Sequence, residues 1–404
     1  MKLNYIDNYY ILLFQIACDV VELAYNDYAN ATQRSKMMQE FFGPEFRLFK
    51  EEIHSIEDAF KKYPEKKDLI LKEVYNALQQ IIDKGVFTNS MIHTLMRQYL
   101  ENATDADRQS IIESVREHLL PIVHTRDGAR VAMYCLWHGT NKDRKTIIKS
   151  FKSHFLKIAT EQHSYMVLLA AFDCIDDTVF LKKAVLDELM SDINFLKASE
   201  SGVRVLKYLV APRSTMFFVP ELIKVLSLGD DNKTSKKDSE KRKKEIFDAV
   251  SEPILRCVED NIEEWFSNSQ WTLFIGAALK VLSGNSTQFI FKKIAEICNK
   301  PYNPEDQDHF LEVSHSTKLI TYLIKCDKEK YSKEMVLFSR ALLDEASDQI
   351  PSWIETNRGC FLLVNIIETE IENVVKNVKE LILPLKSNLE EKKFKGSEIL
   401  LRKL

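Results

Sequence analysis

The amino-acid sequence predicts an all-α solenoid, and three observations support this fold class. Glycine and proline number only 10 each in 404 residues, which disfavours linker-rich and tight-turn β architectures. Nearly every segment carries apolar residues three or four positions apart, the spacing of one face of a helix. A weak internal repeat recurs at intervals of 36 and 38 residues, within the range of periods typical of helical solenoids.

The segment 111–120 illustrates the helical spacing. Ile111, Val115 and Leu119 form one apolar stripe, and Ile112 lies beside it. Alternation of the kind that marks strands is essentially absent, and no heptad pattern is sustained. We therefore expect short antiparallel helices stacked in series rather than one long coiled coil.

The repeat places a small residue before an apolar helix. Its clearest copies are residues 127–136, 163–172 and 201–210, which align Gly128, Ser164 and Gly202. Fainter copies begin at Gly43, Ser90, Ser316, Gly359 and Gly396, and one near Gln270 follows a longer interval. Such units cannot bury an apolar face alone, so we expect neighbours to share a continuous core.

The net charge of −4 conceals a division along the chain. Residues 1–120 carry 14 basic and 19 acidic side chains, residues 121–246 carry 22 and 16, and residues 247–404 carry 20 and 25. A positive centre between acidic flanks predicts an anionic partner for the central third. Polar stretches at 229–245 and 299–308 interrupt the helical pattern, and both are predicted to be solvated loops, the first running into a helix.

The seven cysteines form no C-x-x-C pair and are predicted to be reduced core residues of an intracellular protein. Residues 9–18 have the length of a signal-peptide core. Asp7 precedes them, however, and no cleavage site follows, so we expect no signal peptide. We also expect no membrane span, because Asp19 and Glu22 interrupt the best candidate.

One run, from His124 to Thr140, reads HTRDGARVAMYCLWHGT and is followed by KDRK at 142–145. It strongly resembles the Puf-A/Penguin branch of the Pumilio-repeat proteins. Shorter matches extend the resemblance over roughly residues 17–404: residues 24–27, 168–177, 211–213, 235–238, 357–359 and 395–401.

The resemblance implies an α-helical repeat array, bent into an L, that binds RNA or DNA without reading a base sequence. It also implies a nuclear and nucleolar protein that acts in ribosome assembly and in translational control of messenger RNA. We expect a monomer that binds ribosomal precursor RNA, messenger RNA or DNA, together with pre-ribosomal proteins, and that needs no cofactor and no membrane. The family's array starts earlier, with basic repeats that we expect this chain to lack.

The resemblance divides the chain into four parts. Residues 1–16 are an unmatched N-terminal segment, 17–228 are Pumilio-like repeats, 229–245 are a basic polar loop, and 246–404 are divergent C-terminal repeats.

A Pumilio-type repeat reads one base with two side chains one helical turn apart, and the residue after the first stacks between bases. We call these the reader and stacking places. The reader places hold Ala129 and Met133, Tyr165 and Leu169, Val203 and Lys207, Thr317 and Thr321, and Cys360 and Val364. Apolar pairs cannot distinguish donors from acceptors on a base edge, so we expect little or no sequence-specific readout.

Basic side chains supply the candidate nucleic-acid contacts. Arg130 and Arg204 occupy stacking places, where each could lie on a base, contact phosphate, or instead pair with Asp127 or Glu200. A predicted helix following the first repeat carries a basic ridge with spacings of 3, 4 and 3, made of Lys142, Lys145, Lys149 and Lys152. Charge of this kind can neutralise phosphates or simply face solvent. The predicted contact residues are Arg126, Arg130, Lys142, Arg144, Lys145, Lys149, Lys152, Arg204, Lys207, Lys241, Arg242, Lys243 and Lys244.

The last four of these residues could equally form a nuclear-import signal or a plain polar loop. Catalysis finds little support, because no P-loop, nucleophile elbow, H-E-x-x-H or dinucleotide motif occurs. Asp173, Asp176 and Asp177 are interpreted as ordinary surface rather than a cation site, and His124 and His138 as packing or capping residues. The alternative to a nucleic-acid binder is a protein-binding solenoid whose acidic flanks dock basic ribosomal or chromatin proteins.

Overall fold

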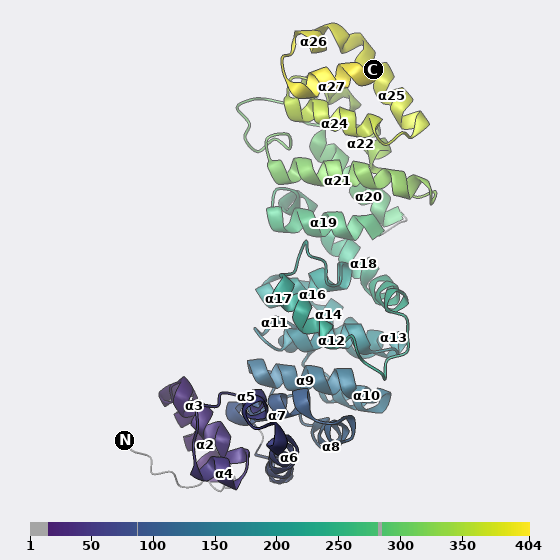
Figure 1. Ribbon diagram of the computed structural model, residues 1–404. Helices are drawn as coiled ribbons and strands as arrows, with labels where there is room; N and C mark the ends of the chain where they lie inside the picture. The colour runs from purple at the N-terminus through teal and green to yellow at the C-terminus, as the bar shows by residue number, and fades with distance from the viewer. Residues whose placement is uncertain (1–14, 87, 282–284) are drawn as a thin grey trace. The chain divides into compact units, whose positions relative to one another are not determined.

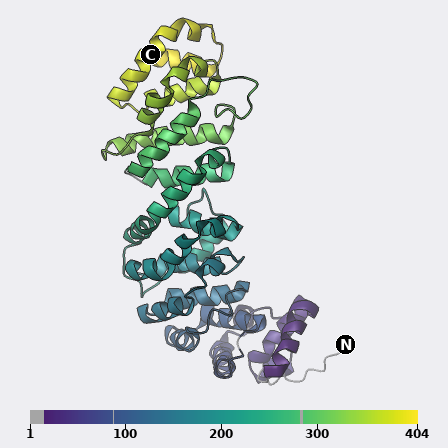
Figure 2. The same cartoon turned by 180° about the vertical axis from the view of Figure 1, so that it is seen from behind.

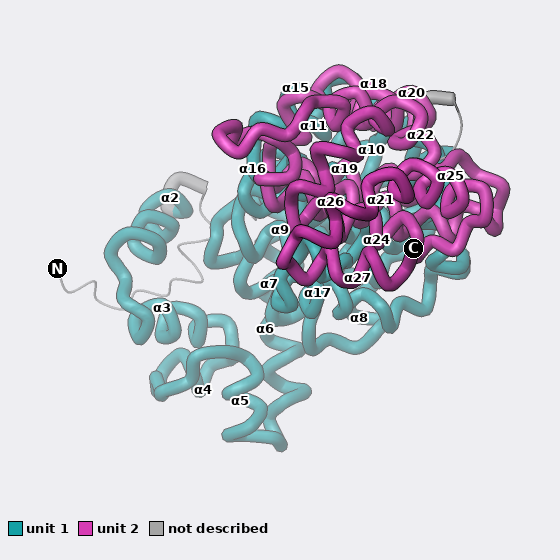
Figure 3. Tube along the Cα trace, turned by 90° about the horizontal axis from the view of Figure 1, so that it is seen from above, with its two compact units in different colours: residues 1–249 teal, residues 250–404 magenta. Residues whose placement is uncertain are grey.

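The computed structural model describes residues 15–86, 88–281 and 285–404. In these ranges every regular element is helical and no strand occurs, so the predicted all-α fold class is confirmed (Figure 1). Of the predicted N-terminal segment, residues 1–16, positions 1–14 lie outside the described residues. Contacts divide the chain into two compact units, residues 1–249 and 250–404, which Figure 3 colours separately.

Unit 1 consists of short helices joined by tight turns. The helices are α2 (Gln15–Leu23), η1 (Ala24–Tyr28), α3 (Ala31–Met38), η2 (Gln39–Phe41), α4 (Pro44–Leu48), α5 (Ile56–Lys62), η3 (Pro64–Lys66), α6 (Lys67–Asp83), α7 (Ser90–Asn102), α8 (Asp105–Val115), α9 (Arg126–His138), α10 (Asn141–Ser150), α11 (Phe155–Thr160), α12 (Tyr165–Cys174), α13 (Thr178–Leu181), η4 (Lys182–Leu186), α14 (Asp187–Ser191), α15 (Ile193–Lys197), α16 (Glu200–Val210) and α17 (Pro220–Ser227). The longer α18 (Ser239–Phe266) begins in unit 1 and continues into unit 2.

Unit 2 continues the pattern with α19 (Ser269–Val281), α20 (Asn285–Cys298), α21 (Ser314–Tyr331), α22 (Phe338–Ala346), η5 (Ser347–Gln349), α23 (Ile350–Trp353), α24 (Asn357–Ile367), α25 (Glu372–Ile382), η6 (Leu383–Leu385), α26 (Lys386–Glu391) and α27 (Lys395–Lys403). In the part of the chain that the structure describes, no helix is both long and apolar enough to cross a bilayer.

The repeat predicted from the sequence corresponds to one row of helices in each unit. In unit 1, α7, α9, α12 and α16 pack side by side, and we call them the unit 1 row (Figures 1 and 2). In unit 2, α19, α21, α24 and α27 form the unit 2 row in the same way. Other helices pack behind each row, so every row helix buries apolar side chains on both flanks, as a solenoid requires. All seven cysteines are buried and free of disulfides, as predicted.

Three row helices begin with the same cap. A Ser or Thr hydroxyl accepts the backbone N–H of the glycine three residues later, at 2.9 Å in each case, which satisfies a donor that the helix leaves free. The pairs are Thr125 and Gly128, Ser199 and Gly202, and Thr356 and Gly359.

The glycine of this cap is required by close packing of the backbone. A Cβ on Gly128 would lie 2.0 Å from the carbonyl oxygen of Ile122, six residues earlier. The corresponding contacts at Gly202 and Gly359 are 2.3 and 2.1 Å. In α12 the same place holds Ser164, whose hydroxyl donates to the carbonyl of Ile158, also six residues earlier, at 2.8 Å. At these four row helices the small residue therefore lets the preceding turn close.

Replacing Gly128 by Ala should destabilise unit 1 by about 1–3 kcal/mol, because the added methyl group forces the Ile122 carbonyl to move. Alanine is intrinsically the better helix former by about 1 kcal/mol, so any loss of stability reports the steric contact. The measurement is urea unfolding followed by circular dichroism. Ser164→Gly is the matched control, since it introduces the repeat's own glycine and should cost no more than one hydrogen bond, about 1 kcal/mol. A Gly128→Ala variant as stable as the parent would contradict this explanation.

The stretch 229–245 runs into a helix as predicted, but its loop is bound to other elements rather than simply solvated. Residues 239–245 already belong to α18, and residues 229–238 are bound to the rest of unit 1. The Thr234 hydroxyl donates to the carbonyl of Gly139 at 2.9 Å, and the backbone N–H of Lys236 donates to Asp176 at 2.7 Å. The polar side chains that suggested solvation instead find partners on other elements, and we call residues 229–238 the docked loop. The predicted loop at 299–308 is confirmed, since no helix occurs between α20 and α21.

Candidate nucleic-acid interface

Two adjoining cavities lie along the unit 1 row. The first has a volume of about 620 Å³ and a polar, charged lining drawn from α7, α9, α17 and the segment 25–34. The second has a volume of about 380 Å³ and a largely apolar lining that includes Met133, Tyr165 and Leu222. Both volumes fall within the range of about 300–1,000 Å³ typical of ligand sites. Arg126 and Arg130 line both cavities, so they stand at the point where the two meet.

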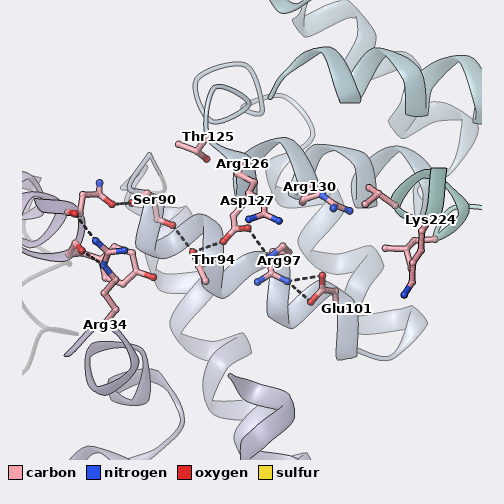
Figure 4. A pocket seen from close by; sticks show the side chains of 14 residues that line it. Arg34, Ser90, Thr94, Arg97, Glu101, Thr125, Arg126, Asp127, Arg130 and Lys224 are labelled. Carbon is pink, nitrogen blue, oxygen red and sulfur yellow. Dashed lines mark hydrogen bonds and ion pairs between the residues drawn. The ribbon is translucent and has the colours of Figure 1, made fainter. Parts of the chain in front are cut away.

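These two arginines lie one turn apart on α9, so both guanidinium groups project from one face. Arg126 is exposed and Arg130 is half-buried. Among the described residues, neither makes a hydrogen bond or an ion pair, and Figure 4 shows both side chains without a partner. Burial lowers the pKa of Arg130 from its ordinary value, and the neighbouring Arg126 and Arg97 lower it further. The positive charge at this point lacks a counter-ion, and an anion would supply one.

The nearby carboxylates are engaged by Arg97. Its Nε lies 2.9 Å from Asp127 and its Nη1 lies 2.8 Å from Glu101, while Asp127 also accepts from Thr94 at 2.7 Å (Figure 4). The alternative interpretation that Arg130 pairs with Asp127 is therefore wrong. The first cavity is lined by five cationic side chains, Arg34, Arg97, Arg126, Arg130 and Lys224, and by only two carboxylates, which leaves a net charge of +3.

Arg204, which lines the second cavity, behaves differently. It forms an ion pair with Glu200, so for this residue the pairing alternative is confirmed. Its guanidinium also lies 5.6 Å from the centroid of the Tyr165 ring. Lys207 is half-buried with its ammonium 5.6 Å from the Phe217 ring, and burial lowers its pKa. The second cavity thus combines apolar and aromatic surface with cations along one edge.

The reader places of unit 1 offer little for a base edge. Ala129 and Met133 are buried and present only alkyl and thioether surface to the second cavity. Leu169 and Val203 are also buried. In unit 2 the Thr317 hydroxyl is engaged, because it donates to the backbone carbonyl of Phe310 at 2.7 Å.

Two predicted contact residues, Arg144 and Arg242, are corrected by the structure. Arg144 is 1% exposed and donates to the carbonyls of Leu136 and Trp137 at the end of α9, and to Thr234 of the docked loop at 2.6 Å. Arg242 is 5% exposed and is bound to Asp176 at 2.9 Å. Neither is available to a phosphate, because the N–H groups of each guanidinium donate to acceptors inside unit 1. Both arginines hold the docked loop in place.

The basic ridge lies on α10 and, at Lys152, on the turn that follows it, and none of its lysines lines the two cavities. Lys145 forms an ion pair with Asp177 at 2.8 Å. Lys142, Lys149 and Lys152 are exposed and form no ion pair with any described residue. Three further predicted residues occupy the first turns of α18: Lys241 and Lys244 are exposed, and Lys243 pairs with Glu240 at 2.7 Å. The predicted contact residues therefore lie on separate surfaces. The surface that carries Arg126, Arg130 and Arg204 is the one that lines the two cavities.

The acidic cluster near the end of α12 has cationic partners at each member. Asp173 pairs with Arg213, Asp176 with Arg242, and Asp177 with Lys145. Among the described residues no group of three or more His, Cys, Asp or Glu side chains is placed to hold a metal ion. His138 stacks on Tyr134 with 5.8 Å between ring centroids, and burial lowers its pKa to about 4, in keeping with a packing residue.

Sequence reasoning missed Arg34, Arg97 and Lys224. Arg97 stands eight residues after Asn89, which precedes α7, just as Met133 stands eight residues after Thr125. Counting each repeat from its cap residue, instead of from its small residue, would have placed Arg97 at a reader place. Arg34 and Lys224 come from segments outside the row, and the repeat pattern carries no signal for them.

Comparisons with known proteins agree with this architecture. Residues 198–336 match the family model described as CPL (NUC119) domain. Pumilio homolog 3 from Danio rerio is 35% identical over 399 residues, which cover 96% of this chain and 63% of that protein. The chain thus spans somewhat less than two thirds of the length of this relative.

Two solved structures are similar over almost the whole chain. The crystal structure of human Puf-A matches with a TM-score of 0.85 and 33% identity, covering 98% of this chain and 78% of that one. The crystal structure of human Puf-A in complex with DNA matches with a TM-score of 0.84 and 32% identity, covering 99% and 78%.

Proposed function

Because this chain belongs to the Puf-A/Penguin branch of the Pumilio-repeat proteins, we propose that it binds RNA or DNA through the phosphate backbone without reading base sequence. The observation that carries the proposal is the pair Arg126 and Arg130 at the junction of two cavities, two cations that have no carboxylate partner in the described part of the chain. Human Puf-A, which shares this fold, has been crystallised with DNA. Phosphate is the anion that the net positive lining of the first cavity favours.

The reader places support the proposed absence of base reading. The guanidinium of Arg97, which also stands at a reader place, is engaged by Asp127 and Glu101, and Lys207 is half-buried beside the Phe217 ring. Ala129 and Met133 offer no donor or acceptor, and the apolar second cavity suits the face of any base equally well. Affinity then depends on the number of phosphates neutralised, which is the same for every sequence of a given length.

The cellular role that we propose is the one implied by the family. In this proposal the protein is nuclear and nucleolar, acts as a monomer on ribosomal precursor or messenger RNA, and supports ribosome biogenesis or translational control beside pre-ribosomal proteins. The basic central third of the chain supports an RNA partner. Crosslinking of the tagged protein to RNA in cells, followed by sequencing, should recover ribosomal precursor or messenger RNA. Recovery of basic proteins without RNA would favour the protein-binding solenoid instead.

Fluorescence anisotropy against several unrelated RNA and DNA oligonucleotides of equal length is the direct test. Affinities should agree within about tenfold, or about 1.4 kcal/mol. A plot of log affinity against log salt should have a slope of about −3 to −4, as expected for roughly five neutralised phosphates on a single strand. One sequence preferred by much more than tenfold would contradict non-specific binding, and no binding at low salt would contradict nucleic-acid binding by this chain.

A further inference from the structure

A third cavity lies on the unit 2 row and shares no lining residue with the two unit 1 cavities. It has a volume of about 400 Å³ and is lined by α21 and by Arg358 at the start of α24. From α21 it takes side chains at positions 314, 317, 318, 321, 322 and 325, the spacing of one helix face. This lining is rich in hydroxyl and cationic groups, in a unit that carries an excess of acidic residues.

The cations of this cavity are mostly uncompensated. Lys318 and Lys325 are exposed, and neither forms an ion pair with any described residue. Arg358 donates to the backbone carbonyl of Leu311 at 2.7 Å and lies 3.7 Å from the carboxylate of Glu312. The cavity thus brings together three cations, of which Arg358 alone has a carboxylate partner among the described residues. Two other lysines of the same region are paired, Lys328 with Glu370 and Lys333 with Glu329, so an unpaired lysine is not simply the rule for this helix.

The position of Lys318 in its repeat matches that of Arg130. Lys318 stands five residues after Val313, which precedes α21, and Arg130 stands five residues after Thr125, which precedes α9. The two solenoid units therefore present a cation at the same place of a row helix. The surroundings differ, since the unit 2 cavity carries the hydroxyls of Ser314 and Thr321 where the second cavity of unit 1 carries Met133 and Tyr165. Hydroxyl and ammonium donors suit phosphate oxygens rather than the face of a base.

We propose that the α21 face of unit 2 is a second phosphate-binding site for nucleic acid, in which Lys318 and Lys325 each neutralise a backbone phosphate and Arg358 borders the site. The proposal rests on the proposed function. It extends RNA or DNA contact into a unit whose acidic charge suggests protein docking.

The test is anisotropy of the full chain with a long mixed-sequence single-stranded RNA, over a range of salt concentrations. Replacing Lys318 and Lys325 by Gln removes two phosphate contacts, so the log–log slope should become shallower by about 1.4 and affinity at about 0.1 M salt should fall on the order of 25-fold. The control Lys328→Gln/Lys333→Gln removes two exposed charges from the same region and should change neither quantity. Thermal unfolding verifies that both variants are folded.

The same pair of substitutions is also made in an Arg126→Gln/Arg130→Gln background, which separates the two proposals. A further loss of slope in that background supports the second site. An unchanged slope and affinity in both backgrounds overturns the second site while leaving the proposed function intact. An equal loss of affinity in the Lys328/Lys333 control also overturns the second site, because the loss is then a diffuse effect of charge. If the Lys318/Lys325 variant loses affinity and slope but the Arg126/Arg130 variant does not, the second site is supported. The proposed role of Arg126 and Arg130 as phosphate contacts is then refuted.

Discussion

Reversing Arg126 and Arg130 to Glu is expected to weaken binding of single-stranded RNA by about 100-fold, on the order of 2.8 kcal/mol. The substitutions remove the two cations that both unit 1 cavities share, and in the first cavity they raise the number of carboxylates from two to four. Since neither arginine has a partner within the described part of unit 1, the loss of stability should be small. Anisotropy at moderate salt measures the affinity, and thermal unfolding measures the stability.

The matched control is Lys72→Glu/Lys84→Glu, which makes the same change of charge on exposed residues of unit 1 that line neither cavity. It should lower affinity several-fold at most, through the long-range field alone. A third variant, Lys145→Glu/Lys149→Glu/Lys152→Glu, tests the basic ridge on α10. Abolition of binding by the ridge variant, with the Arg126/Arg130 variant unaffected, would move the interface from the cavities to α10.

Replacing Arg144 by Met is expected to destabilise unit 1 by about 3 kcal/mol or more, since each buried acceptor left without a donor costs about 1–3 kcal/mol. The buried guanidinium satisfies two carbonyls at the end of α9, and it also binds Asn232 and Thr234 of the docked loop. Methionine fills similar space but donates no hydrogen bond, so these acceptors lose their partner inside the protein. Urea unfolding followed by circular dichroism gives the free energy of unfolding.

Lys142→Met is the control for this prediction, because Lys142 lies two residues earlier on the same helix and is exposed. It should change stability by less than about 0.5 kcal/mol. Below the unfolding transition, the Arg144→Met variant should retain its RNA affinity per folded molecule. A variant of full stability that has lost RNA binding would restore Arg144 to the interface and refute the structural role.

The fold was largely predictable because helical periodicity and the small residue of each repeat are local signals. The interface was predictable only in part. Arg126 and Arg130 follow from the repeat register. Asp127, however, pairs with Arg97 rather than with Arg130, and Arg97 belongs to a neighbouring repeat, 30 residues earlier in the chain. Within one repeat only the pairing of Asp127 with Arg130 can be considered, and the packing of α7 against α9 brings Arg97 to Asp127 instead.

Burial of basic residues was the main error. In the sequence, Arg144 lies among Lys142, Lys145 and Lys149, and Arg242 lies among Lys241, Lys243 and Lys244, so both look like members of exposed basic runs. Both exceptions are arginines, whose planar group can serve several carbonyl and carboxylate acceptors at once. Some of their acceptors, Asn232 and Thr234 for Arg144 and Asp173 and Asp176 for Arg242, lie 66 to 90 residues away in the chain. Composition and spacing carry no record of these partners.

The docked loop also affects how unit 1 unfolds. In a simple repeat array each repeat contacts only its neighbours, and segments at opposite ends can open independently. Here Thr234 is bound to Arg144, 90 residues earlier, and Lys233 pairs with Asp105, 128 residues earlier. The Lys233–Asp105 pair is exposed and adds little. The buried Arg144, however, joins residues from α9 to the start of α18 into one cooperative block, which native-state hydrogen exchange would register as a shared opening free energy.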